Sequence, residues 1–295
     1  MCRFVMYLGP KISLSSLVTE PSHSIIHQSI KAKELEEPLN GDGFGVAWYA
    51  PELSDEPAIF KDVSPAWNNQ NLLNLAPVVE SRCLLAHVRA ATPGLPVSQL
   101  NCHPFGWKNL AFMHNGHIEG FAKIRRKMRN RLSDAAYQWV KGSTDTEHLF
   151  GLFIDEFSRL PEGPTAERIF RALQSTIRMV EEMSAGVRGD KPSQLNLVVT
   201  DGNCAVVTRF SSDDTPPNTL YINSNRSYQC DDEGEIHLEK TGEQAVLVAS
   251  EPLTDDSTWT CVNPDHAVII DEQRQVSQQP LDINLSKAGA EAVSA

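Results

Sequence analysis

The chain opens with MCRFVMYLGP (residues 1–10), in which a cysteine directly follows the first methionine. Residues 2–8 are rich in β-branched and aromatic side chains, and Gly9 and Pro10 follow them. This pattern predicts a strand that ends at a turn. Cys2 then has two interpretations. It is either a small apolar residue at the edge of a strand or, once Met1 is removed, the first residue of the mature protein, with a free α-amine beside its thiol.

Length and composition are those of a globular protein. The 295 residues suffice for one large domain or two small ones, and the hydrophobic fraction of 41% allows a sizeable core. The net charge is −12, from 26 Lys and Arg against 38 Asp and Glu. Such an acidic balance repels phosphate backbones and anionic lipids, so we expect neither nucleic acid nor a membrane as a partner.

The cysteines and the N-terminus indicate the compartment. None of the six cysteines forms a C-x-x-C pair, and thiols in a reducing environment fit a chain of this length better than a disulfide framework. The apolar run FVMYL (residues 4–8) is too short for the core of a signal peptide, and no stretch approaches membrane-spanning length. We therefore expect a cytoplasmic protein.

Hydrophobic patterning divides the chain into strands, then helices, then strands. Short apolar strands are predicted around residues 44–50, 83–91 and 110–116, helices over 119–140, 143–160 and 165–184, and further strands from 195 onwards, with a hairpin at Asp201-Gly202-Asn203. This order predicts one α+β domain with helices packed outside stacked antiparallel sheets. We place the domain at residues 2–272 and a C-terminal tail, expected to be flexible, at 273–295.

Cys2 is the candidate nucleophile. An α-amine with a reference pKa of roughly 7.7–8.0 could accept the thiol proton, directly or through a water, so no separate histidine base is needed. An acyl-transfer nucleophile also needs donors for the oxyanion. The sequence HNG at 114–116 offers the Asn115 side-chain amide and the Gly116 backbone N–H, although Asn-Gly is also a common turn dipeptide.

Two charged residues could hold a substrate. Arg89 stands near the end of an apolar strand, where its guanidinium would suit a carboxylate ligand or an internal salt bridge. Asp145 stands at the start of a predicted helix and could hold an ammonium group. Taken in isolation, the segment is explained better by capping alone, because Thr144 and Glu147 match a capping box. Together these parts suit a substrate with an α-amino-acid head and a side-chain carbonyl, such as glutamine or another γ-glutamyl amide.

The landmarks also occur in a recognisable order. They are MC at 1–2, NGDGFG at 40–45, HVRAAT at 87–92, NCHPF at 101–105, HNG at 114–116 and STDTE at 143–147. In this order and at these intervals, the chain resembles the class II glutamine amidotransferase domain, an N-terminal-nucleophile hydrolase. The resemblance spans roughly residues 1–270. It is stronger to the amidotransferase-like subunit of fungal glutathione degradation, and the bacterial γ-glutamyl hydrolase of ergothioneine synthesis is a further relative.

The resemblance implies a four-layer αββα sandwich and a role for each matching position. Cys2 would be the nucleophile, Arg89 would bind the substrate α-carboxylate and Asp145 its α-ammonium. Asn115 and Gly116 would form the oxyanion hole, the carbonyl of Gly41 would orient the Cys2 amine, and Thr92 and His103 would line the pocket. Amidotransferases that make amino sugars have Trp where this chain has Ala90, so a built-in ammonia acceptor is not expected.

These parts predict a cysteine-dependent hydrolase of γ-glutamyl amides that releases glutamate through a γ-glutamyl thioester. No metal and no organic cofactor is needed. Two alternatives remain: a glutaminase subunit that passes ammonia to a separate synthase, and a non-catalytic γ-glutamyl-binding scaffold. A partner enzyme subunit and a homo-oligomer both stay open. His23 and His27, four residues apart, could share a metal, and the basic run KIRRKMRNR (residues 123–131) could dock an acidic partner, but a solvated helix face explains that run more simply.

Overall fold

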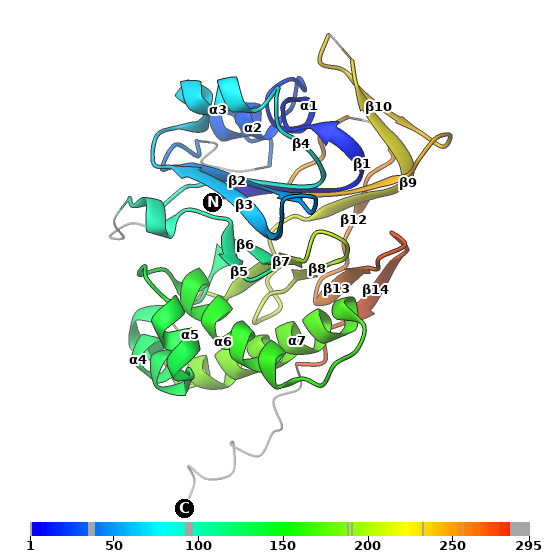
Figure 1. Cartoon of the computed structure of the whole chain (residues 1–295). Coiled ribbons are helices and arrows are strands. Elements are labelled where there is room, and N and C mark those ends of the chain that lie inside the picture. Colours follow the sequence, from blue (N-terminus) through cyan, green and yellow to red (C-terminus); the bar gives the residue numbers. More distant parts are fainter. Residues whose placement is uncertain are drawn as a thin grey trace, which may run out of the picture.

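Two antiparallel sheets, stacked face to face, form the centre of the computed structural model, which describes residues 2–34, 39–91, 97–187, 189, 191–231, 233–255 and 257–283. Figure 1 shows short helices on one side of the stack and longer helices on the other. The first sheet has the order β10 (Ile236–Glu239), β9 (Tyr221–Cys230), β11 (Ala245–Ala249), β1 (Arg3–Ser13), β4 (Glu80–Val88), β2 (Phe44–Ala50) and β3 (Ser54–Asp62), with β12 (Thr260–Cys261) paired to β9.

The second sheet follows the same antiparallel plan. Its order is β14 (Val276–Pro280), β13 (His266–Ile270), β8 (Ala205–Arg209), β7 (Gln194–Thr200), β6 (Leu110–His117) and β5 (Phe105–Trp107). The hairpin between β7 and β8 turns at residues 201–203, where the sequence predicted it. Asp201 Oδ1 accepts hydrogen bonds from the backbone N–H groups of Asn203 and Cys204, so the aspartate stabilises the turn.

Helices cover the outer face of each sheet. The first sheet carries α1 (Ser15–Val18), α2 (Ile25–Ile30), η1 (Ala66–Asn68) and α3 (Gln70–Leu75), and the second carries α4 (Phe121–Arg131), α5 (Asp134–Trp139), α6 (Asp145–Arg159) and α7 (Thr165–Ser184). A short turn, η2 (Gln99–Asn101), precedes β5. The predicted four-layer αββα arrangement is therefore confirmed.

Alternation along the central strands builds three separate cores, because successive strand residues face opposite sides of a sheet. On β1, Phe4 and Met6 pack between the sheets, whereas Val5 and Tyr7 pack toward α1, α2 and α3. On β6, Ala111 and Met113 pack between the sheets, and Phe112 packs toward α6. The Phe112 ring stacks on that of Phe150, with ring centroids 4.4 Å apart.

Three expectations about the elements need correction. First, β1 does not end at Gly9-Pro10; it continues to Ser13 after a register shift between Leu8 and Ile12, which lets the sheet accommodate a proline. Second, the helix predicted over 119–140 is two helices, because the Ser133 side chain accepts from Ala136 N–H and starts α5. Third, the expected tail begins too early, since β14 pairs with β13; residues 284–295 lie outside the described residues.

Candidate active site

The candidate residues converge because three strands end at the same place. Cys2 precedes β1, Arg89 follows β4, and Asn115 lies near the end of β6. Each continues the set of its strand that packs between the sheets: Phe4 and Met6 lead to Cys2, Leu85 and His87 to Arg89, and Ala111 and Met113 to Asn115. In the β1–β4 register, Arg3 pairs with Val88, so Cys2 falls opposite Arg89.

The Cys2 thiol is half-buried, and its Sγ lies 3.6 Å from the carbonyl oxygen of Ala90. Burial raises the pKa of the Cys2 thiol above its ordinary value, and the charge of Arg89 opposes that rise only in part. The thiol therefore stays protonated near neutral pH. A nucleophilic role requires a base that takes this proton.

The Arg89 guanidinium is 4% exposed, and its Nη1 donates to the Asp42 carbonyl oxygen at 3.3 Å. Among the described residues, no carboxylate forms an ion pair with it. The internal salt bridge considered from the sequence is therefore not found there. A buried cation without a counter-charge is costly, and an anionic ligand would neutralise it.

The loop that holds Arg89 is itself fixed by the backbone. Asp42 N–H donates to the Arg89 carbonyl oxygen at 3.0 Å, and Arg89 N–H donates to the Gly43 carbonyl oxygen at 2.9 Å. The Asp42 carboxylate accepts from Ala91 N–H at 2.8 Å. The NGDG segment is thus tied to the chain that follows β4. Gly41 lies in this segment against Trp67, because an added Cβ would come within 2.9 Å of the Trp67 ring.

Asp145 is the first residue of α6, and its carboxylate faces the end of β6. Its Oδ2 accepts from Ile118 N–H at 2.8 Å, and its Oδ1 accepts from Thr146 N–H at 2.8 Å. The negative charge of Asp145 also raises the pKa of the Cys2 thiol. The expected capping box is half correct. Thr144 caps the helix through Glu147 N–H, but the Glu147 carboxylate binds the backbone of Lys141 and Gly142 instead.

Asn115 is completely buried, and its Nδ2 lies 3.3 Å from Ser250 Oγ. Ser250 Oγ also accepts from Phe4 N–H at 3.1 Å, so Asn115 is linked to the strand that carries Cys2. Gly116 follows, paired with Leu195 on β7. A Cβ at Gly116 would overlap the Gln194 carbonyl oxygen, so only glycine fits here.

Three buried imidazoles lie behind this edge, and each is already engaged. His87 Nε2 lies 3.1 Å from both the His114 carbonyl oxygen and His103 Nδ1, and the His114 ring bonds to Thr146 Oγ1 and the Gln194 carbonyl oxygen. Burial lowers the pKa of His87 to about 3 and lowers those of His103 and His114. Neutral, bonded imidazoles of this kind are poor bases for Cys2. Predicted pocket residue His103 belongs to this cluster, while Thr92 lies outside the described residues.

Residues that the sequence analysis did not assign complete the edge. Arg3 and Glu251 are each 1% exposed and form an ion pair, with 2.7 Å between Arg3 Nε and Glu251 Oε1. Arg3 Nη1 donates to the Cys2 carbonyl oxygen at 3.1 Å. Glu251 and its neighbour Ser250 directly follow β11, so they are polar residues at the end of an apolar strand. The same signal, polar residues at the end of an apolar strand, applies to the three strands that carry the candidate residues, and it could also have identified Ser250 and Glu251.

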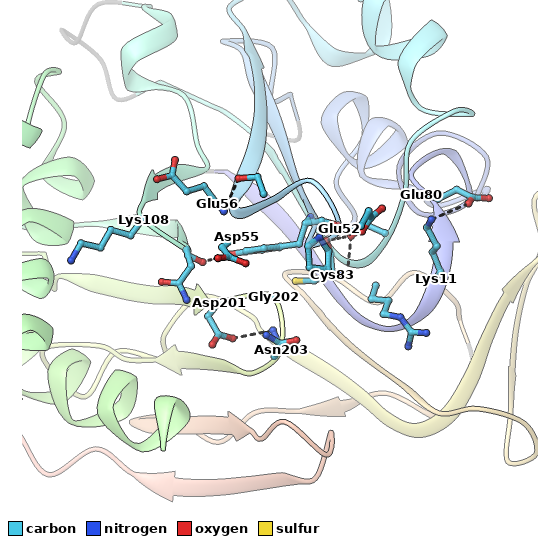
Figure 2. Close-up of a pocket in the computed structure, with 16 residues that line it drawn as sticks. Lys11, Glu52, Asp55, Glu56, Glu80, Cys83, Lys108, Asp201, Gly202 and Asn203 are labelled. Carbon is cyan, nitrogen blue, oxygen red and sulfur yellow. Dashed lines mark hydrogen bonds and ion pairs between the residues drawn. The ribbon is translucent and has the colours of Figure 1, made fainter. Parts of the chain in front are cut away.

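A cavity of about 640 Å³ lies at the other end of the strands. Figure 2 shows its lining, in which charged side chains of both signs come from the two sheets. The labelled residues are Lys11, Glu52, Asp55, Glu56, Glu80, Cys83, Lys108, Asp201, Gly202 and Asn203. None of the candidate catalytic residues lines it, so this cavity is separate from the candidate site.

The described part of the chain has neither a metal-binding cluster nor a helix that could span a membrane. No group of three or more His, Cys, Asp or Glu side chains is placed to hold a metal there. His27 bonds to Ser24 and Pro21, and His23 lies 3.4 Å from Glu251, so the two histidines have separate partners. None of the described helices combines the length and apolar character that a membrane span requires.

The αββα sandwich has a cysteine at the start of a central strand, with amide, cationic and acidic groups around it. This arrangement defines the N-terminal-nucleophile class of amidohydrolases. The chain matches the family described as "Glutamine amidotransferases class-II" over residues 16–291. It therefore belongs to the class II glutamine amidotransferase family, and it is an enzyme of that type.

Individual relatives agree with this assignment. The chain is 38% identical to the probable glutamine amidotransferase DUG3 of Saccharomyces cerevisiae, over 95% of this chain and 84% of that protein. It is 26% identical to the gamma-glutamyl-hercynylcysteine sulfoxide hydrolase of Mycobacterium tuberculosis, over 96% of this chain and 97% of that protein. A solved glutamine aminotransferase class-II domain protein from Silicibacter pomeroyi is 26% identical, with a TM-score of 0.64, over 95% of this chain and 99% of that chain.

Proposed function

We propose that the protein is a cysteine-dependent hydrolase of γ-glutamyl amides whose nucleophile is Cys2 after removal of Met1. One observation carries the proposal: the half-buried Cys2 thiol lies opposite Arg89, a buried guanidinium that has no carboxylate partner among the described residues, and the Asp145 carboxylate lies beside the end of β6. Arg89 binds the substrate α-carboxylate and Asp145 the α-ammonium, so the γ-carbonyl is presented to Cys2. The buried charge of Arg89 supports its part, because a bidentate carboxylate would neutralise it.

The reaction proceeds in two steps. The Cys2 α-amine takes the thiol proton, the sulfur attacks the γ-carbonyl carbon, and Asn115 and the Gly116 N–H stabilise the oxyanion. The C–N bond then breaks, and the amine leaves with the proton from the α-ammonium of Cys2. Water next attacks the γ-glutamyl thioester, and the C–S bond breaks to release glutamate and regenerate the thiol. The raised pKa of the Cys2 thiol supports the need for an adjacent amine.

The remaining site residues have supporting parts in this proposal. The Gly41 carbonyl orients the Cys2 amine, and His103 lines the pocket. No metal or organic cofactor enters the reaction. The leaving group is an amine such as ammonia, cysteinylglycine or another amino compound. The hydrolase relative, named for a γ-glutamyl substrate, supports this broader substrate class. We place the reaction in the cytosol, where the six free thiols would persist.

A second candidate function is a glutaminase subunit that passes ammonia to a separate synthase. The name of the yeast relative, a probable glutamine amidotransferase, favours it. In that case the protein would co-purify with a larger subunit and release glutamate from glutamine faster in its presence. A homo-oligomer is compatible with either function.

The test measures glutamate release by the purified protein from glutamine, glutathione and γ-glutamylcysteine. We expect turnover of at least one substrate, and no turnover by Cys2→Ala. Intact-mass measurement should show a chain that lacks one methionine. If wild type and Cys2→Ala both bind a γ-glutamyl ligand in calorimetry and neither hydrolyses it, the protein is a scaffold and the proposed function is wrong.

A further inference from the structure

Ser250 connects the two halves of the candidate reaction centre. Its backbone N–H donates to the Phe4 carbonyl oxygen at 3.0 Å, and its Oγ accepts from Phe4 N–H at 3.1 Å. The same Oγ lies 3.3 Å from the Asn115 amide. Ser250 is 0% exposed. Phe4 is two residues from Cys2, so this one hydroxyl links the nucleophile strand of the first sheet to the oxyanion residue on the second.

When the Asn115 amide is oriented with Nδ2 toward Ser250, two groups lack hydrogen-bond partners. One is Asn115 Oδ1, which is buried without a hydrogen-bond partner among the described residues. The Ser250 hydroxyl only accepts, from Phe4 N–H and Asn115 Nδ2, so its own proton has no acceptor within the described residues. A buried acceptor left without a partner costs roughly 1–3 kcal/mol.

A half-turn of the Asn115 amide gives both Asn115 Oδ1 and the Ser250 hydroxyl proton a hydrogen-bond partner. The amide oxygen and nitrogen of asparagine are distinguished by their hydrogen-bond partners. After the half-turn, the Ser250 hydroxyl donates to Asn115 Oδ1 and still accepts from Phe4 N–H. Asn115 Nδ2 then occupies the position that Oδ1 held, where no described protein group engages it. A free donor at that position is what an oxyanion requires.

We propose that Ser250 is a positioning residue: its hydroxyl fixes the Asn115 amide with Nδ2 free for the oxyanion, and it ties that amide to the Cys2 strand. The inference rests on the proposed function for its catalytic meaning. Ser250 itself takes no part in bond making or bond breaking. Ser250 acts only through Asn115, and this dependence separates positioning from a general structural effect.

A double-mutant cycle tests the catalytic part. Loss of one oxyanion donor costs about 10²–10³ in kcat, and we expect Ser250→Ala to lower kcat about 10–100-fold with little change in KM. In an Asn115→Ala background the same substitution should change kcat by less than about twofold. Ser81→Ala is the matched control, because Ser81 Oγ bridges the N–H and carbonyl of Tyr49 at the far end of the first sheet. An equal loss of kcat in both backgrounds would overturn the proposal.

A second measurement does not depend on turnover. Asparagine-selective ¹³C and ¹⁵N labelling identifies the Asn115 side-chain signals by their loss in Asn115→Ala. Ser250→Ala should shift the Asn115 carbonyl signal, because Oδ1 loses a donor, and Ser81→Ala should leave it in place. An unmoved carbonyl signal in Ser250→Ala would contradict the orientation. If Ser250→Ala shifts the Asn115 carbonyl signal but the wild-type protein hydrolyses no γ-glutamyl substrate, the orientation is upheld and the proposed function is rejected.

Discussion

The buried ion pair between Arg3 and Glu251 should dominate the stability of the N-terminal strand. Glu251 Oε1 accepts from Arg3 Nε at 2.7 Å and from Glu34 N–H at 3.1 Å, and Oε2 accepts from Lys33 N–H at 2.9 Å. The Arg3 guanidinium also reaches the Cys2 carbonyl oxygen. Glu251→Gln keeps the shape and one acceptor oxygen, but it leaves the Arg3 charge buried without a counter-charge.

Two routes give the size of the effect. Removing one partner of a buried pair costs about 3–5 kcal/mol. Independently, burial acts to raise the pKa of Glu251, but the His23 ring at 3.4 Å and the charge of Arg3 outweigh burial and lower that pKa from 4.5 to about 2. A shift of that size corresponds to about 3 kcal/mol. For a chain of 295 residues, a loss of 3–5 kcal/mol lowers Tm by about 5–8 °C.

Urea unfolding and thermal melting of Glu251→Gln provide the assay. Glu243→Gln is the matched control, since Glu243 is 57% exposed beside Arg82 and Arg274 and such pairs contribute about 0–1 kcal/mol. The double variant Arg3→Met with Glu251→Met should be more stable than Glu251→Gln, because no buried charge remains. Since the pKa of Glu251 is lowered on folding, its stabilisation is complete above about pH 4.5 and is lost as the pH falls toward 2. A loss below about 1 kcal/mol for Glu251→Gln at pH 7 would refute this account.

Three further outcomes are expected. Burial lowers the pKa of His87 to about 3, so the unfolded state binds more protons than the folded state below pH 6.5. The free energy of unfolding should therefore fall by about 2 kcal/mol between pH 7.5 and 5 because of this residue. Urea titrations of His87→Asn should show a smaller fall. Gly116→Ala should abolish glutamate release and cost about 1–3 kcal/mol in urea unfolding, because its Cβ overlaps a carbonyl, whereas Gly163→Ala, with open space around it, should do neither. Arg89→Lys should raise KM about 10–100-fold with a smaller change in kcat, because a bidentate contact is lost; an unchanged KM in initial-rate kinetics would remove Arg89 from substrate binding.

Local signals in the sequence predicted much of the fold. The hairpin at Asp201-Gly202-Asn203 and the helix over 165–184 are confirmed because turn chemistry and helical periodicity act over a few residues. Boundaries are harder to predict where two local signals compete. Gly9-Pro10 predicts the end of a strand, but an antiparallel partner on β4 resumes pairing after the irregular stretch and carries β1 on to Ser13.

The placement of the candidate residues follows from the sequence where strand alternation applies, and not where a partner is distant in the chain. Through the two-residue period of their strands, Cys2 and Arg89 belong to the inner face of the first sheet and Asn115 to the inner face of the second, and each stands in a motif of its own. The contact between Arg3 and Glu251 joins residues 248 positions apart, and neither residue alone indicates the other. The same holds for the link between Asn115 and Ser250. The register of β11 beside β1 brings Arg3 to Glu251, and the stacking of the two sheets brings Asn115 to Ser250.

The two ends of the sandwich differ in how their charges are compensated, and this difference favours the Arg89 end over the cavity as the place where a γ-glutamyl substrate would bind. At the cavity, Lys11 lies 3.6 Å from Glu80, and Arg82 lies 3.8 Å from Glu243, with all four side chains at least half exposed. Water and nearby carboxylates already stabilise those cations, so a ligand gains little by replacing them. At the opposite end, Arg89 is buried, and its Nη1 donates to the Asp42 carbonyl oxygen. A γ-glutamyl carboxylate that enters there supplies a counter-charge that the described residues do not provide, and binding energy is largest where the free protein leaves a charge uncompensated.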